Sequence, residues 1–211
     1  MSRLRRIVLV RHGETEGESS TRFHGAGDVA LSAEGEAQMR AVAASFGPTR
    51  FDRVIASPLQ RSWRAAQIAG HTDAVRVEAD FREIDFGRWE GLTKQEIEAS
   101  DPVLYEDWQN KTAGFEFPNG EPRGDFRARV EAGLDRLLDS GAGTALVVVH
   151  KGVVRTIAEK LLGAPLEEGT PDLAGQVELY KESDGWKLGR VGSNPAAVDS
   201  TPSLQVEAPA A

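Results

Sequence analysis

The sequence predicts an α/β protein in which helices cover both faces of a mostly parallel central sheet, a three-layer α/β/α sandwich. Two patterns predict this class. Short β-branched runs alternate with helical stretches along most of the chain, and such alternation is typical of strand–helix–strand units. One run, Thr144 to Val149, is apolar and β-branched almost throughout, which indicates a strand buried on both faces.

In the first half of the chain, each expected strand leads through a turn into a helix. The first strand, Arg6 to Val10, ends in charged residues, as buried strands that feed functional loops often do. The elements that follow are a helix from an N-cap at Ser32 to about Phe46, a strand over residues 51–56, a helix from Ser57-Pro58 to about Ala69, and a strand over residues 75–77. We expect Pro58 in the first turn of its helix, where proline is tolerated.

The second half contributes three helices, the long buried strand, a further helix and a hairpin. The expected helices cover residues 93–100, 102–108 and 125–139, with Asp125 as a cap of the last. After the strand comes a helix over residues 153–162, and residues 177–180 and 186–191 form a hairpin around Asp184-Gly185. We therefore expect one domain over residues 1–192. Residues 193–211 are rich in Ala, Pro, Ser and Asp and are expected to be a disordered tail.

Composition excludes several classes of function. The 211 residues include no cysteine, which rules out disulfides, thiolate metal sites and a cysteine nucleophile. The net charge is −8 and no basic stripe is present, so nucleic acid is not an expected partner. No run approaches the ~20 apolar residues of a membrane span, and the apolar run at residues 7–10 is too short for a signal peptide. We expect a cytoplasmic protein, and a homodimer remains open.

Two histidines follow expected strands in the same way. His12 comes after the first strand and His150 directly after the fourth, and a glycine follows each within two residues. Ligand sites in open α/β sheets form at the carboxyl ends of strands, so we expect both imidazoles to face one pocket. Arg61 follows the second strand and Glu83 the third, which would bring both side chains to the same rim.

These residue types suit phosphoryl transfer. A phosphoryl group needs dispersed positive charge, and an arginine fork can bond two of its oxygens at once. Arg11, Arg22 and Arg61 are candidates for this clamp. A neutral imidazole, with an ordinary pKa of ~6.5, makes His12 a nucleophile near neutrality. The expected partner is therefore a small-molecule phosphate ester, and no metal or other cofactor is expected.

The departing oxygen also needs a proton. A carboxylic acid near the leaving group supplies ~10²–10⁴-fold in rate. Glu83 is the favoured acid, and Asp85 and Glu90 compete with it for this role.

The sequence resembles the histidine phosphatase superfamily, also called phosphoglycerate-mutase-like, over about residues 6–192. No single motif is specific, but the order in which the motifs occur is. The matching segments are Arg11-His12-Gly13-Glu14-Thr15, Arg22 before Gly25, residues 31–35 with Gln38, Ser57-Pro58-Leu59-Gln60-Arg61, residues 83–91, and the strand that ends in His150 with Gly152 and Arg155.

The resemblance implies a phosphohistidine intermediate on His12. It also implies that His150 bonds the phosphoryl oxygens, that Arg11 and Arg61 complete the charged core, and that Glu83 donates the proton to the leaving group and later activates water. The fold it implies is the phosphoglycerate-mutase-like sandwich.

The resemblance places Arg22 on the substrate side of the pocket, and three further positions depart from the family pattern. Glu18 stands where asparagine is usual, His24 where glutamine is common, and Lys151 where glycine or alanine is frequent. We assign Glu18, His24 and Lys151 with Arg22 to substrate binding.

The expected activity is metal-independent hydrolysis of phosphomonoesters. A phosphoglycerate-type mutase is the alternative enzyme. Bisphosphoglycerate-dependent mutases of the family usually carry a longer insertion before the second histidine, so the resemblance, with only a short segment from Gly91 to Arg123, implies hydrolysis. A non-catalytic phosphate-binding adaptor on the same fold is the alternative from another class, motivated by the departures at Glu18 and Lys151.

Overall fold

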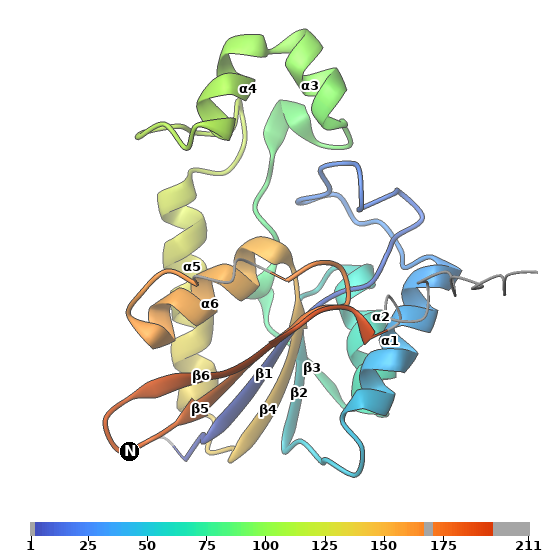
Figure 1. Cartoon of the computed structure of the whole chain (residues 1–211), viewed down its shortest axis with the longest axis vertical. Helices are drawn as coiled ribbons and strands as arrows, with labels where there is room; N and C mark the ends of the chain where they lie inside the picture. Colours follow the sequence, from blue (N-terminus) through green and yellow to red (C-terminus); the bar gives the residue numbers. More distant parts are fainter. Residues whose placement is uncertain (1–2, 167–170, 196–211) are drawn as a thin grey trace, which may run out of the picture.

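The computed structural model describes residues 3–166 and 171–195, which build a six-stranded sheet in the order β3-β2-β4-β1-β5-β6 (Figure 1). The strands are β1 (Arg6–Arg11), β2 (Arg53–Ala56), β3 (Val75–Val77), β4 (Thr144–Val149), β5 (Gln176–Lys181) and β6 (Trp186–Gly192). The first four strands in the sheet order run parallel. The expected hairpin, β5 and β6, adds two antiparallel strands beside β1. The predicted α/β class with a mostly parallel sheet is confirmed.

In the described part of the chain, four helices cover the two faces of the sheet, and two lie beyond the carboxyl ends of its parallel strands (Figure 1). They are α1 (Ala33–Ser45), α2 (Gln60–Gly70), α3 (Lys94–Ser100), α4 (Pro102–Gln109), α5 (Arg123–Leu138) and α6 (Lys151–Leu162), with 3-10 turns η1 (Ala79–Phe81) and η2 (Gly87–Trp89). Core residues of α1 and α2 pack on one face of the sheet, and those of α5 and α6 pack on the other. Helices α3 and α4 stand apart from the sheet, beyond the ends toward which β1 runs (Figure 1).

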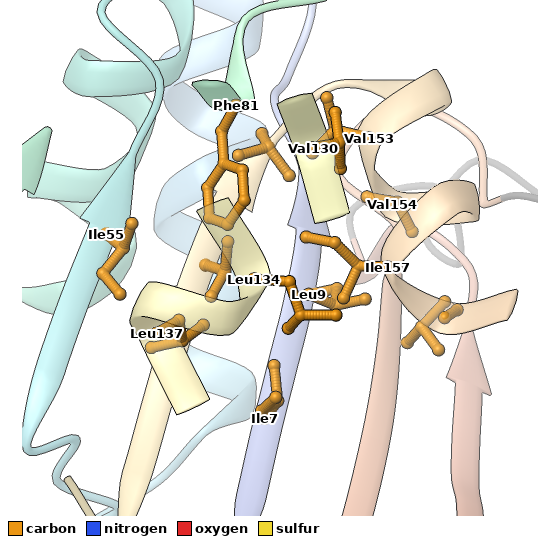
Figure 2. Close-up of a cluster of buried hydrophobic side chains, with 14 of the residues drawn as sticks. Ile7, Leu9, Ile55, Phe81, Val130, Leu134, Leu137, Val153, Val154 and Ile157 are labelled. Carbon is orange, nitrogen blue, oxygen red and sulfur yellow. The ribbon is translucent and has the colours of Figure 1, made fainter. Parts of the chain in front are cut away.

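Alternation along β1 divides the core between the two faces. Ile7 and Leu9 join the cluster under α5 and α6 (Figure 2), whereas Val8 and Val10 join the cluster under α1 and α2. Successive side chains of a strand point to opposite faces. All four are at most 1% exposed, so β1 is a central strand buried on both sides.

Helix ends follow local capping chemistry where the chain supplies it. The Ser32 side chain accepts a hydrogen bond from Gly35 N and caps α1, as predicted. A capping box joins Thr93 and Glu96 at the start of α3, which satisfies two otherwise free amides of the first turn.

Three predicted helix starts are wrong. Helix α2 begins at Gln60, so Pro58 precedes the helix instead of lying in its first turn. The cap comes from a distant residue, because Asp28 Oδ1 accepts from Gln60 N at 2.7 Å. Helix α5 begins at Arg123, which places Asp125 inside the first turn and not at the cap. Helix α6 begins at Lys151, directly after His150, two residues before the predicted start at Val153.

A third, smaller core lies between η2 and the pair α3–α4. It is mostly aromatic, and its buried members are Trp89, Ile97, Tyr105 and Phe115.

Within the described ranges, no helix has the length and apolar character needed to cross a membrane. The predicted tail, residues 193–211, lies outside the described residues apart from residues 193–195.

Candidate active site

The two histidines lie side by side because β1 and β4 are paired in register. Arg11 pairs with Val149, and the next residue on each strand is a histidine. His12 N donates to Val149 O at 2.9 Å. The imidazole centroids of His12 and His150 are 5.2 Å apart, with the rings edge to face. Both residues are buried, so the structure brings together the two side chains that the strand ends predicted.

The proton on His12 is located by a backbone carbonyl. His12 Nδ1 lies 2.7 Å from Gly13 O. Because a carbonyl only accepts, Nδ1 donates, and Nε2 of the neutral ring keeps its lone pair. Gly13 is required beside it, since a Cβ there would lie 2.6 Å from Gly35 O.

The same surroundings keep the His12 ring neutral. Burial lowers the pKa of His12 well below its ordinary value, and the charges of Arg61 and Arg11 lower it further. A cationic imidazole would be poorly hydrated there and repelled by both guanidinium groups. His12 therefore presents an unprotonated Nε2.

His150 is oriented by a buried serine. Ser57 Oγ lies 2.7 Å from His150 Nε2 and accepts from Leu59 N at 3.2 Å. Ser57 is 0% exposed, so its hydroxyl hydrogen would be unsatisfied unless it bonded to Nε2. That bond puts the ring proton of His150 on Nδ1, a buried donor with no partner among the described residues. Burial, followed by Arg61, lowers the pKa of His150 well below its ordinary value.

Arg61 has a structural task as well as a charge. It extends from α2, is 0% exposed, and donates to the carbonyls of Gly27, Gly25 and His24 at 2.6–3.1 Å. Its terminal nitrogens thus hold the loop over residues 24–27, while its charge acts on both histidines. The Nε atoms of Arg61 and Arg11 are buried and have no partner among the described residues.

The position of Glu83 distinguishes it from the two competing carboxylates. Glu83 Oε2 accepts from Gly152 N at 2.9 Å and Oε1 from Ile84 N at 3.0 Å. Gly152 lies in the first turn of α6, two residues after His150, so Glu83 lies against the histidine segment. Asp85 instead accepts from Gly87 N.

Glu90 accepts hydrogen bonds from the backbone of another loop. Its carboxylate accepts from the amides of Gly25, Ala26, Gly27 and Phe86. Of the three carboxylates considered, Glu83 is therefore the one that bonds to the segment carrying His150.

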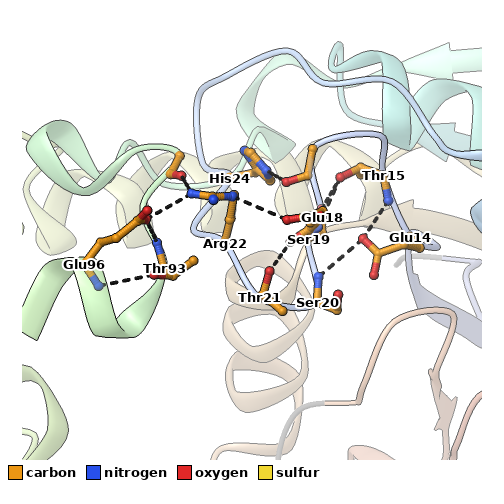
Figure 3. A network of polar contacts seen from close by, with 12 residues as sticks. Glu14, Thr15, Glu18, Ser19, Ser20, Thr21, Arg22, His24, Thr93 and Glu96 are labelled. Carbon is orange, nitrogen blue, oxygen red and sulfur yellow. Dashed lines mark hydrogen bonds and ion pairs between the residues drawn. The ribbon is translucent and has the colours of Figure 1, made fainter.

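Glu18, Arg22 and His24 form a polar network along the loop over residues 14–24 (Figure 3). Glu18 pairs with Arg22 at 3.5 Å, and Arg22 continues to Glu96 at 3.0 Å and to Gly91 O at 2.8 Å. The His24 ring bonds to Gly17 O.

This network ties the loop to α3. It also meets the charged core at His24, because Arg61 Nη2 donates to His24 O at 3.1 Å. The Glu18 carboxylate is 69% exposed and paired, so its charge is partly offset by Arg22. Glu18 and Arg22 thus bond to each other and to α3, whereas His24 lies closer to the two histidines: it bonds to Arg61 through its carbonyl and contributes to lowering the pKa of His12.

Lys151 is the first residue of α6 and is exposed. Partial burial lowers the pKa of its ammonium, and the nearby charge of Arg11 lowers it further, against the attraction of Asp172. Lys151 therefore lies near Arg11, at the start of the helix that follows His150.

Sequence reasoning missed three contributors to this site. Ser57 stands in a recognised motif, but its bond to His150 joins residues 93 positions apart. The amide of Gly152 could not be anticipated as a partner of Glu83, because a backbone amide is present in every residue type except proline. Arg129 reads as an ordinary helix charge, yet it donates to the Glu83 carbonyl.

The family is decided by a match over most of the chain. The model of the histidine phosphatase superfamily (branch 1) matches residues 7–194. The chain belongs to this superfamily. The predicted resemblance and the phosphoglycerate-mutase-like fold are therefore confirmed.

Members of the superfamily with curated names include phosphatases and a mutase. A glucosyl-3-phosphoglycerate phosphatase of Mycobacterium tuberculosis is 31% identical over 78% of each chain. A probable phosphoglycerate mutase of Yersinia enterocolitica is 30% identical over 75% of each chain. The crystal structure of a putative alpha-ribazole-5'-P phosphatase from Escherichia coli has a TM-score of 0.79 at 26% identity, covering 90% of this chain and 97% of that one.

The chain spans less than half the length of the first curated relatives that it matches. These relatives are 36% identical to it over 163 residues, which are 75% of this chain and 44% of theirs.

Replacing Ser57 by alanine should remove the hydrogen bond that fixes the tautomer of His150. We expect Ser57→Ala to lower kcat/KM by roughly tenfold, because losing a buried hydrogen bond costs about 1–3 kcal/mol. The measurement that isolates the cause is ¹⁵N–¹H correlation of the His150 ring, which should change from protonated Nδ1 toward a mixture. An unchanged Nδ1–H tautomer in the variant would contradict the role given to Ser57.

His12 should remain neutral through the ordinary range of histidine titration. Since burial and two arginines lower its pKa, we expect the NMR shifts of its ring to stay constant from pH 8 down through pH ~6.5. Protonation should begin only at lower pH. A full titration step centred near pH ~6.5 would show that the pocket does not disfavour the cation.

Proposed function

We propose that this chain is a metal-independent phosphomonoester hydrolase that uses His12 Nε2 as its nucleophile. The observation that carries the proposal is the His12–Gly13 hydrogen bond of 2.7 Å in a pocket that lowers the pKa of the ring. Together they leave an unprotonated Nε2 among positive charges, as attack on a phosphate requires. Activity as a phosphatase also agrees with the named relatives.

In the first step, the Nε2 lone pair forms a bond to phosphorus while the bond from phosphorus to the ester oxygen breaks. Glu83, as a carboxylic acid, gives its proton to the departing oxygen, and the alcohol leaves. Arg11, Arg61 and the Nδ1–H of His150 stabilise the negative charge spread over the phosphoryl oxygens. His12 then carries the phosphoryl group.

In the second step, water attacks the phosphohistidine and the Glu83 carboxylate takes its proton. The bond from Nε2 to phosphorus breaks, and the lone pair returns to the ring. Inorganic phosphate leaves, with Glu83 protonated for the next cycle. Each half of the reaction uses the same carboxyl group, first as acid and then as base.

The substrate is a small phosphate ester whose alcohol part lies toward the loop over residues 14–24. We assign Arg22, Glu18 and His24 to that side, where they shape the loop and its link to α3. Lys151 supplies a further positive charge at the pocket edge. The bonds of Glu18 and Arg22 to each other and to α3, and not to the two histidines, support a role of these two residues in choosing the alcohol over a role in phosphoryl transfer.

Removing the nucleophile should abolish phosphate release. We expect His12→Ala to lower kcat on 4-nitrophenyl phosphate by at least ~10³-fold, since the variant lacks the nucleophile on which the phosphohistidine forms. Acid-quenched wild type should hold an acid-labile, base-stable phosphoryl group that His12→Ala lacks. His71→Ala is the matched control because His71 is exposed at the end of α2. Equal rates for His12→Ala and wild type would overturn the proposal.

Water, and not a second alcohol, should take the phosphoryl group. We expect 3-phosphoglycerate, if accepted, to yield inorganic phosphate faster than 2-phosphoglycerate, with and without added bisphosphoglycerate. Phosphate assay and isomer analysis of the same reaction compare the two rates. Isomerisation faster than phosphate release would favour the mutase.

A further inference from the structure

Arg129 connects α5 to the segment that carries Glu83, and all its hydrogen-bonding capacity goes to that connection. Nε and Nη2 donate to the two oxygens of Glu121 at 2.6 and 2.7 Å. Nη1 donates to the carbonyls of Asp80 and Arg82 at 2.7 and 2.8 Å, and Nη2 to that of Glu83 at 3.1 Å. A guanidinium has five N–H donors, so none is left over.

The segment after η1 needs such a connection because it belongs to no helix or strand. Residues 82–86 run without regular secondary structure, so no ladder of backbone bonds fixes their path. Arg129 has a side chain only 15% exposed and bonds three carbonyls around this turn. It therefore fixes the backbone from which the Glu83 side chain departs.

Small displacements of Glu83 would matter at the other end of its side chain. The carboxylate fits between the amides of Ile84 and Gly152, and a Cβ on Gly152 would come within 2.5 Å of Glu83 Oε1. A proton donor must lie within hydrogen-bond reach of the leaving oxygen. The backbone position set by Arg129 is thus transmitted to the acid.

Glu121 extends the connection toward the α3–α4 side of the molecule. Its amide donates to Asp85 O at 3.0 Å, and its bidentate pair with Arg129 is mostly buried, with side chains 20% and 15% exposed. Such fork-to-carboxylate pairs are geometrically specific. Glu121 thereby orients the guanidinium that holds the Glu83 backbone.

We propose that Arg129, oriented by Glu121, is the positioning residue that places Glu83 as proton donor. The inference rests on the proposed function, in which Glu83 is the acid. Arg129 touches no reacting atom in this scheme and acts through the backbone of Glu83. Its charge also contributes to lowering the pKa of His150, a contribution that Arg129→Lys retains. If Arg129 merely stabilised the fold, its loss would affect all substrates alike, whereas loss of acid placement affects most the substrates whose leaving group needs a proton.

Two aryl phosphates of similar shape separate these effects. Phenol is a more basic leaving group than 4-nitrophenol, so phenyl phosphate depends more on protonation. We expect the ratio of kcat/KM for 4-nitrophenyl phosphate to that for phenyl phosphate to rise about 10–100-fold in Glu83→Gln. It should rise at least several-fold in Arg129→Met and by a smaller factor in Glu121→Gln. The parameter kcat/KM is used because it reports the steps up to phosphorylation of His12.

Arg136→Met is the matched control on the same helix. Arg136 pairs with Glu78 and Asp80 beside η1, is 52% exposed, and makes none of the bonds to the carbonyls of residues 82 and 83. The ratio of the two kcat/KM values in Arg136→Met should equal that of wild type. Arg129→Lys serves where Arg129→Met fails to fold, because it keeps the charge with three donors, and its ratio should be intermediate.

A raised ratio in Glu83→Gln with a wild-type ratio in both Arg129 variants would overturn the positioning role. A wild-type ratio in Glu83→Gln would instead remove Glu83 as donor, and the inference would fall with that part of the proposed function. Trapping of phosphohistidine from 4-nitrophenyl phosphate should persist in Arg129→Met. Loss of the trap there, with wild-type folding by circular dichroism, would also contradict a role confined to the acid.

Discussion

The parallel pairing of β1 with β4 is the constraint on which the site depends. Register places Arg11 opposite Val149, so the chain leaves both strands at the same level and the next residues are His12 and His150. The two rings come within 5.2 Å because the two strands are neighbours in the centre of the sheet. A shift of one residue in this pairing would turn one imidazole toward the opposite face.

Burial gives these imidazoles their chemistry. Desolvation and two guanidinium groups lower the pKa of both rings, in a protein whose net charge is −8. Positive charge is concentrated locally at the ends of the strands, where hydrogen bonds to Gly13 and Ser57 decide which nitrogen of each ring carries the proton. An acidic chain can in this way concentrate positive charge around two buried imidazoles.

Charged side chains hold the irregular segments near the two histidines by bonding to their backbone atoms. Arg61 holds the loop over residues 24–27 from one side, and Glu90 accepts from amides of the same loop. Arg129 does the same for the segment that carries Glu83. Charged side chains in this fold therefore act largely on carbonyls and amides, which fixes loops that have no secondary structure of their own.

The sequence by itself determined the α/β class, the central strands and which side chains meet at their ends. Periodicity reports burial face by face, and residues after parallel strands share one edge, so His12, His150, Arg61 and Glu83 could be placed together. It could not locate the cap of α2, which Asp28 provides, or the partners of Ser57 and Arg129. These bonds join residues far apart in the chain and many end on backbone atoms, which every residue type offers alike. Only the tertiary structure decided them, because their formation depends on where the loops lie after the sheet has assembled.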